Sequence, residues 1–260
     1  MSEHEGFRVE VEDGVAELVL DDPRSRNSLS LATIDGLIAE FEALGGRTDA
    51  DVIVLGHAGP AFSAGHDLRE MTERDLPFYQ QLFDRCNVLM QILHELPQPV
   101  IARVDGVATA AGCQLVASCD LVVATDRSTF ATPGVRIGLF CSTPMVALSR
   151  SVGRKRALQM LLTGDPVDAA TAADWGLVNS VVAPDALVPH VDDLASQLRR
   201  FSPHTLGLGK RAFYEQIEMT ESAAYDHTRQ VMSANAADRV AAEGISAILH
   251  KRDPHWPCLL

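Results

Sequence analysis

The sequence predicts an α/β protein with a helical region at its C-terminal end. Up to about residue 145, strand patterns alternate with helix patterns, as in folds where helices pack on a largely parallel sheet. Two candidate strands, 51–57 and 121–125, are almost continuously apolar, which is typical of strands buried on both faces of a sheet. Beyond that point the patterns are nearly all helical, and these three features together favour a mixed core followed by helices.

The first half of the chain contains clear hairpin and helix signals. Two strand-like runs over residues 7–20, separated by Glu-Asp-Gly, predict a hairpin. Ser30 can cap a helix whose apolar residues recur at helical spacing until Gly45-Gly46. A long helix is expected over 75–95, because Pro77 suits its first turn and two prolines follow its end.

The second half reads as a series of helices interrupted by one short strand over 176–182. The last helix is either continuous or interrupted near Asp238. The expected helices are Pro144–Ser151, Arg154–Thr163, Asp168–Trp175, Asp185–Phe201, Pro203–Glu218 and Glu221–His250.

Composition restricts the class of partner. A net charge of −13, with no cluster of basic side chains, argues against nucleic acid and anionic membrane surfaces as partners. No apolar run is long enough for a membrane span, and residues 1–6 lack the pattern of a targeting segment. The five cysteines, Cys86, Cys113, Cys119, Cys141 and Cys258, lack metal-ligand spacing and suggest free thiols. We therefore expect a cytoplasmic protein.

Familiar catalytic motifs are missing from the sequence. It contains no HExxH, Walker A, GxSxG or strand-linked GxGxxG pattern, and its histidines show no metal-ligand pairing. These absences argue against metal, nucleotide-phosphate and serine-hydrolase chemistry.

Two segments rich in small residues, 61–71 and 99–120, stand at predicted strand-to-helix junctions. Small side chains let a ligand approach the backbone, and a helix N-terminus supplies free N–H donors that suit a developing oxyanion. Tight packing of helix against strand explains such residues equally well. Asp67 is placed to cap a helix after the first segment, and Asp105 and Asp120 lie at turns, where we interpret them as structural.

Together the two segments resemble the oxyanion loops of the enoyl-CoA hydratase/isomerase (crotonase) superfamily. The first reads Ala61-Phe-Ser-Ala-Gly-His-Asp-Leu-Arg-Glu-Met, and the second reads Pro99-Val-Ile-Ala-Arg-Val-Asp-Gly-Val-Ala-Thr-Ala-Ala-Gly-Cys-Gln-Leu. Residues 23–29 resemble the family's CoA-contacting loop, and Leu162-Thr-Gly-Asp-Pro resembles its L-T-G motif. The resemblance extends over nearly the whole chain.

The resemblance implies a crotonase-like spiral of ββα repeats over residues 1–200, which would hold the CoA and acyl pocket. It assigns 201–260 to subunit contacts in a homotrimer or a dimer of trimers. The ligand would be an acyl-CoA or enoyl-CoA, with no metal and no cofactor beyond the CoA of the substrate. The backbone N–H groups of Ala64 and Ala111 would hold the thioester oxygen. The implied substrate contacts are Arg24, Ser25, Ser63, Ala64, Gly65, His66, Asp67, Leu68 and Ala111.

The sequence departs from the family at both catalytic glutamates. Gln114 stands at the first position and Gly134 at the second. A glutamine amide does not titrate and glycine has no side chain, so hydratase activity is expected to be weak or absent.

The sequence leaves two interpretations open for several side chains. His66 is either a titratable group facing the ligand or a hydrated loop residue, and Gln114 either orients water or substrate or fills space. Arg24 and Arg26 either meet the CoA phosphates or are solvated, and Cys113 and Cys141 either line a pocket or are small buried apolar residues. The candidate functions are a weak hydratase, a non-catalytic acyl-CoA binding protein, or another oxyanion-dependent reaction (isomerisation, thioester hydrolysis or decarboxylation).

Overall fold

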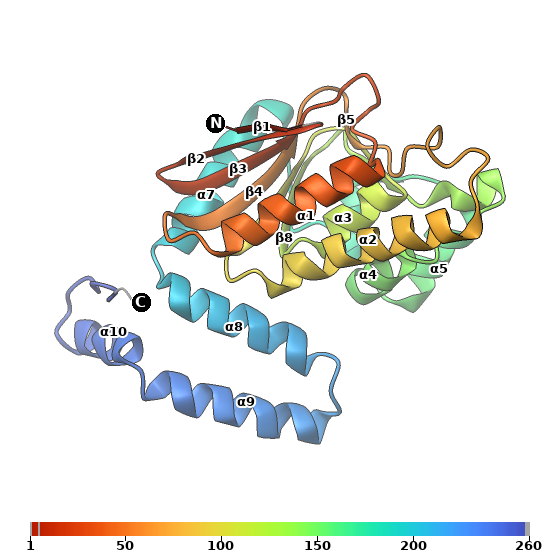
Figure 1. Cartoon of the computed structure of the whole chain (residues 1–260). Helices are drawn as coiled ribbons and strands as arrows, with labels where there is room; N and C mark the ends of the chain where they lie inside the picture. The colour runs from red at the N-terminus through yellow and green to blue at the C-terminus, as the bar shows by residue number, and fades with distance from the viewer. Residues whose placement is uncertain (1, 5, 258–260) are drawn as a thin grey trace.

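The computed structural model describes residues 2–4 and 6–257, which form two sheets surrounded by helices (Figure 1). The larger sheet has seven strands. In spatial order they are β1 (Ser2–His4), β2 (Phe7–Glu12), β3 (Gly14–Leu20), β4 (Ala50–His57), β6 (Val100–Val104), β8 (Leu121–Thr125) and β11 (Ser180–Val182).

The first three strands of this sheet pair in antiparallel fashion, and the strands from β3 to β11 are parallel. The smaller sheet contains β10 (Val167–Asp168), β9 (Thr129–Ala131), β7 (Val107–Thr109) and β5 (Ala61–Ser63) in that order. In it, β9, β7 and β5 run parallel to one another.

The helices follow the predicted order. They are α1 (Leu31–Gly45), α2 (Leu76–Glu95), α3 (Ala111–Ser118), α4 (Pro144–Ser151), α5 (Arg154–Thr163), α6 (Ala169–Trp175), α7 (Leu187–Arg199), α8 (Pro203–Gln216), α9 (Glu221–Ala236) and α10 (Arg239–Leu249). Two short 3₁₀ turns, Pro133–Ile137 and Pro184–Ala186, complete the pattern.

The larger sheet is covered on both faces, which explains its nearly continuous apolar strands. On one face, Val52 and Val54 of β4 pack with the buried Val191 of α7. On the other face, Ile53 and Leu55 join the main core, to which α1 and α2 contribute their apolar stripes. The expectation for 51–57 is confirmed, because alternate side chains enter different cores.

The C-terminal helices extend away from the two sheets. In Figure 1, α8 runs beneath the main body, and α9 and α10 project beyond it. The described part of α9 has no fully buried residue, and Ile248 of α10 is 79% exposed. The chain does break at Asp238, whose carboxylate accepts the Val240 N–H and caps α10.

The α/β fold class is confirmed, and Ser30 and Asp75 cap α1 and α2 as their sequence positions suggest. The helix expected after Asp67 is wrong, because residues 68–73 form turns. Glu70 reaches back and accepts the Leu31 N–H at 2.9 Å, so this segment serves the start of α1 instead. The strand predicted over 176–182 is limited to its last three residues.

Candidate functional site

The two predicted loops meet at the smaller sheet, where β5 and β7 are parallel neighbours. Glycines make this approach possible. A Cβ on Gly65, whose φ is +84°, would lie 3.0 Å from the Ala111 nitrogen. A Cβ on Gly112 would lie 2.3 Å from the Ser63 carbonyl oxygen. The start of α3 therefore packs directly against the loop that follows β5.

The backbone amides of the first loop are mostly committed to internal hydrogen bonds. Three have acceptors: Ala64 N–H donates to the Arg26 carbonyl (3.0 Å), Gly65 N–H to Ser63 Oγ (3.1 Å) and Asp67 N–H to the Leu29 carbonyl (3.3 Å). Within residues 2–4 and 6–257, no such acceptor meets the His66 N–H. The prediction that Ala64 supplies a free donor therefore needs correction, because among the described residues 64–67 the amide without an acceptor is that of His66.

The second donor is the amide of Ala111, the first residue of α3. Amides of a first helical turn have no partner within their own helix. Ala110 precedes it at φ +52° and ψ −120°, a conformation held by its own N–H, which donates to the Ala131 carbonyl at 2.9 Å. The position of the buried Ala111 amide therefore depends on Ala110, whose strained backbone is held by the hydrogen bond to β9.

The loop over 22–29 is organised by a residue that sequence reasoning missed. Asn27 is buried and its Nδ2 donates to the carbonyls of Ala58 (2.9 Å) and Ala61 (2.8 Å). Its φ of +53° follows one of +59° at Arg26. An asparagine in a loop is a known signal for left-handed backbone, and it could have identified this position. Arg24 and Arg26 are exposed, and neither is in an ion pair within the described ranges.

The His66 side chain is not a hydrated loop residue. Its ring lies edge-on to Phe83 at 5.4 Å between centroids. Both ring nitrogens are enclosed and have no hydrogen-bond partner in the described structure. Burial, partly opposed by the Leu29 backbone, lowers the pKa of this imidazole and favours its neutral form.

The two positions of the missing glutamates differ in the space around them. Gln114 lies on α3 with its Oε1 buried and unpartnered among the described residues, and it lines a cavity of about 810 Å³. Gly134 donates its N–H to Cys141 Sγ at 3.3 Å. A Cβ on Gly134 would lie 2.7 Å from the Leu139 carbonyl oxygen. The backbone leaves room for a carboxylate at 114 and none for any side chain at 134.

We expect Gly134→Ala to lower the free energy of unfolding by about 1–3 kcal/mol, because the new methyl group must displace the 139–141 loop. Urea unfolding monitored by circular dichroism measures the effect. Gly209→Ala on α8 is the matched control, since a Cβ there meets nothing within 4 Å. Equal stability of the two variants would contradict the predicted crowding at 134.

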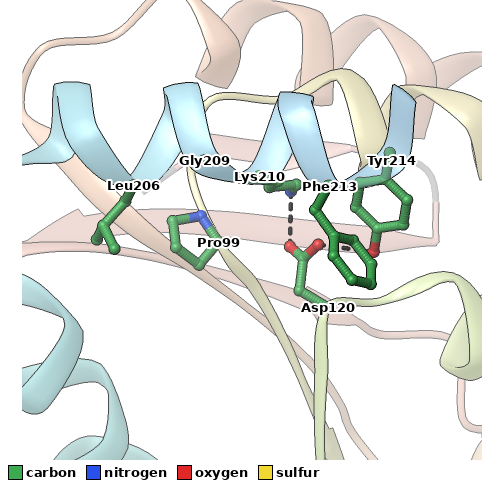
Figure 2. Close-up of a pocket in the computed structure, with 7 residues that line it drawn as sticks. All are labelled: Pro99, Asp120, Leu206, Gly209, Lys210, Phe213 and Tyr214. Carbon is green, nitrogen blue, oxygen red and sulfur yellow. Dashed lines mark hydrogen bonds and ion pairs between the residues drawn. The ribbon is translucent and has the colours of Figure 1, made fainter. Parts of the chain in front are cut away.

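A half-buried carboxylate, that of Asp120, connects α8 to the larger sheet (Figure 2). Asp120 lies 2.6 Å from Lys210 Nζ, accepts the Tyr214 hydroxyl at 2.9 Å and accepts the Val100 N–H at 2.7 Å. Burial lowers the pKa of the Lys210 ammonium, against the opposing effect of Asp120. The structural interpretation of Asp120 is supported, because the groups around this carboxylate join α8 to the sheet.

The remaining candidate residues, Asp105 and the buried cysteines, have structural roles. Asp105 accepts hydrogen bonds from Thr125 and Arg127. Burial raises the pKa of the Cys113 thiol to about 12, which makes it a small apolar residue rather than a nucleophile. Cys86, Cys119 and Cys141 are also free and buried, and Cys258 lies outside the described residues. In the described ranges, no cluster of three potential metal ligands occurs.

Comparison with known proteins agrees with this geometry. The model of the enoyl-CoA hydratase/isomerase family matches residues 10–257. The chain belongs to the enoyl-CoA hydratase/isomerase family. Sequence motifs such as Ala131-Thr-Pro-Gly also indicate the enoyl-CoA hydratase domain-containing protein 3 subgroup. The mitochondrial protein of that name from Rattus norvegicus is 44% identical over 246 residues, covering 94% of this chain and 82% of the relative.

Solved structures of family members are equally similar. An enoyl-CoA hydratase from Mycobacterium smegmatis has a TM-score of 0.95 and 46% identity, covering 96% of this chain and 98% of its own. Human enoyl-CoA hydratase domain-containing protein 3 has a TM-score of 0.94 and 44% identity, covering 96% and 100%. The crotonase fold and the likeness to this subgroup are confirmed.

The expected cytoplasmic location is contradicted. The rat and human relatives are mitochondrial proteins by name, and each aligns with 94% of this chain. The expectation relied on residues 1–6 and on unpaired cysteines, and free thiols do not distinguish between two reducing compartments. None of the helices in the described part combines the length and the apolar character that crossing a bilayer requires.

Proposed function

We propose that the protein binds acyl-CoA or enoyl-CoA thioesters and holds the thioester oxygen between the N–H groups of His66 and Ala111. The observation that carries this proposal is the pair of uncommitted amides on two loops that glycines bring into contact. Preorganised donors of this kind stabilise the negative charge that develops on an enolate oxygen. Each is worth about 2.7–4 kcal/mol in comparable sites.

The surrounding residues receive supporting parts in this proposal. Arg24 and Ser25 lie on the loop that would meet the CoA moiety, and the exposed Arg24 guanidinium suits a phosphate. Ser63 and Gly65 stabilise the conformation of the oxyanion loop through the hydrogen bond from the Gly65 N–H to Ser63 Oγ. Asp67 and the exposed Leu68 form its outer border, where a pantetheine chain would pass.

The helices over 201–260 would make the subunit contacts of a trimer or dimer of trimers, with 1–200 as the core that carries the pocket. Exposed apolar side chains on α9 and α10 support this assignment, because such patches mark interfaces. Family membership supports an oligomer in general, and the choice of assembly is part of the proposal.

The chemistry proposed for this pocket is weak hydration at most. Gln114 and Gly134 provide no group that could take a proton from water. The same observation favours decarboxylation of a 2-carboxyacyl-CoA as a second candidate. In that reaction the bond between the α-carbon and the carboxylate breaks, CO₂ leaves, and the electron pair moves toward the thioester oxygen. Water then protonates the α-carbon to give the acyl-CoA, and the remaining hydroxide combines with CO₂ as bicarbonate.

We expect Gln114→Glu to raise the hydration of crotonyl-CoA by on the order of 10²-fold, since a positioned carboxylate can act as general base. Loss of the enoyl absorbance measures the rate, and Gln114→Ala should stay at the level of the native chain. Turnover by the native chain at ordinary enzyme rates, abolished in Gln114→Ala, would contradict the proposed loss of the catalytic base. Calorimetry with acetyl-CoA tests ligand binding separately.

A further inference from the structure

Helix α2 presents a polar stripe to the cavity that contains Gln114. Asn87, Gln91 and His94 recur at helical spacing and line this cavity of about 810 Å³. The opposite stripe of the same helix is apolar and enters the main core, including Leu89 and Leu93. Asn87 and His94 are half-buried and Gln91 is exposed. A plain hydrocarbon chain in the cavity would displace water from these polar side chains without replacing its hydrogen bonds, which is unfavourable.

The walls facing this stripe are mixed. Their apolar residues include Val116 on α3, Val146 on α4, Phe213 on α8 and Ile217, which directly follows α8. Polar residues stand beside them, including Ser142, Thr143 and Asn179. The cavity therefore suits methylene groups at its apolar residues and offers hydrogen-bonding groups on more than one side.

The polar stripe lies away from the proposed thioester position. Ala111 begins α3, Gln114 lies in its first turn, and the eight residues of the helix span about 12 Å. Asp120 follows the end of α3 and accepts the Tyr214 hydroxyl. His94 stacks on the Tyr214 ring at 3.9 Å between centroids, so it lies near the distal end of α3.

The charges around this distal end are balanced. Arg150 donates to Glu218 at 2.7 Å, and Lys210 lies 2.6 Å from Asp120. Burial, which outweighs the effect of the nearby Asp120, lowers the pKa of His94 and favours its neutral form. A neutral imidazole has one hydrogen-bond donor and one acceptor, so it can bond to a hydroxyl group. It carries no positive charge that would attract a carboxylate.

We propose that this cavity selects acyl chains whose distal end carries an uncharged hydrogen-bonding group such as a hydroxyl, with His94 and its α2 neighbours as the specificity-determining residues. The inference rests on the proposed binding of acyl-CoA thioesters. It adds the chemical class of the acyl group.

Calorimetry of the full chain with four saturated thioesters tests the proposal. Octanoyl-CoA, ω-hydroxyoctanoyl-CoA and suberyl-CoA differ only at the distal end, and acetyl-CoA is too short to reach it. We expect ω-hydroxyoctanoyl-CoA to bind about three- to tenfold more tightly than octanoyl-CoA, the effect of one neutral hydrogen bond. Suberyl-CoA should bind no better than octanoyl-CoA.

The variants His94→Leu and Gln91→Leu should reduce this preference and leave acetyl-CoA binding unchanged. Gln91→Leu also serves if His94→Leu fails to fold, and Gln81→Leu, an exposed position on α2, is the matched control. A preference for octanoyl-CoA or suberyl-CoA, or a hydroxyl preference that neither variant reduces, would overturn the inference. Failure of all four thioesters to bind would instead reject the proposed function.

Discussion

Asp120→Ala is expected to lower the free energy of unfolding by about 3–5 kcal/mol, because it leaves a buried ammonium without its counter-ion. Asp120 satisfies Lys210, Tyr214 and the Val100 N–H at once, and the Lys210 side chain is only 7% exposed. The loss should appear as a lower urea midpoint, together with early release of α8. Tryptophan fluorescence and limited proteolysis report these two events.

A double-mutant cycle separates the ion pair from the packing around it. Lys210→Met removes the ammonium, and the double variant should recover part of the stability that Asp120→Ala loses. Asp49→Ala breaks an exposed pair with Arg47 and is the control, for which little change is expected. If Asp120→Ala resembles Asp49→Ala, the carboxylate does not anchor α8.

The order of the elements could be predicted because local signals determine it. Ser30 and Asp75 accept the N–H groups that their positions at helix starts indicate. The segment after Asp67 shows where this reasoning fails. Its Glu70 bonds to Leu31, 39 residues away in the sequence, and no local pattern reveals a partner at that distance.

The candidate site was predicted at the level of segments and not of individual amides. The resemblance placed a donor at Ala64, but hydrogen-bond partners on the 22–29 loop decide which amide is free. Those partners depend on the left-handed backbone at Arg26 and Asn27. The polar stripe of α2 was also missed, because the sequence does not show that Asn87, Gln91 and His94 line a cavity.

Gly112→Ala is expected to impair both stability and ligand binding, because α3 touches the first loop at this residue. A Cβ there would lie 2.3 Å from the Ser63 carbonyl oxygen and 2.7 Å from Ser63 Cβ, distances that force the backbone apart. Overpacking of this kind costs about 1–3 kcal/mol. A shift of about an ångström between the amides of His66 and Ala111 can cost on the order of 10²-fold in any reaction that depends on both.

Two measurements separate these effects. Urea unfolding gives the stability loss, and calorimetry at a temperature where the variant is fully folded gives the affinity for acetyl-CoA. Gly46→Ala is the matched control, since a Cβ at this position would lie 3.7 Å from the nearest atom, an ordinary contact distance. Residue 46 also lies outside both loop segments. A folded Gly112→Ala protein with native affinity for acetyl-CoA would show that the two loops need not hold their amides in register. In that case the oxyanion site proposed at His66 and Ala111 would have to be abandoned, because its geometry depends on this contact.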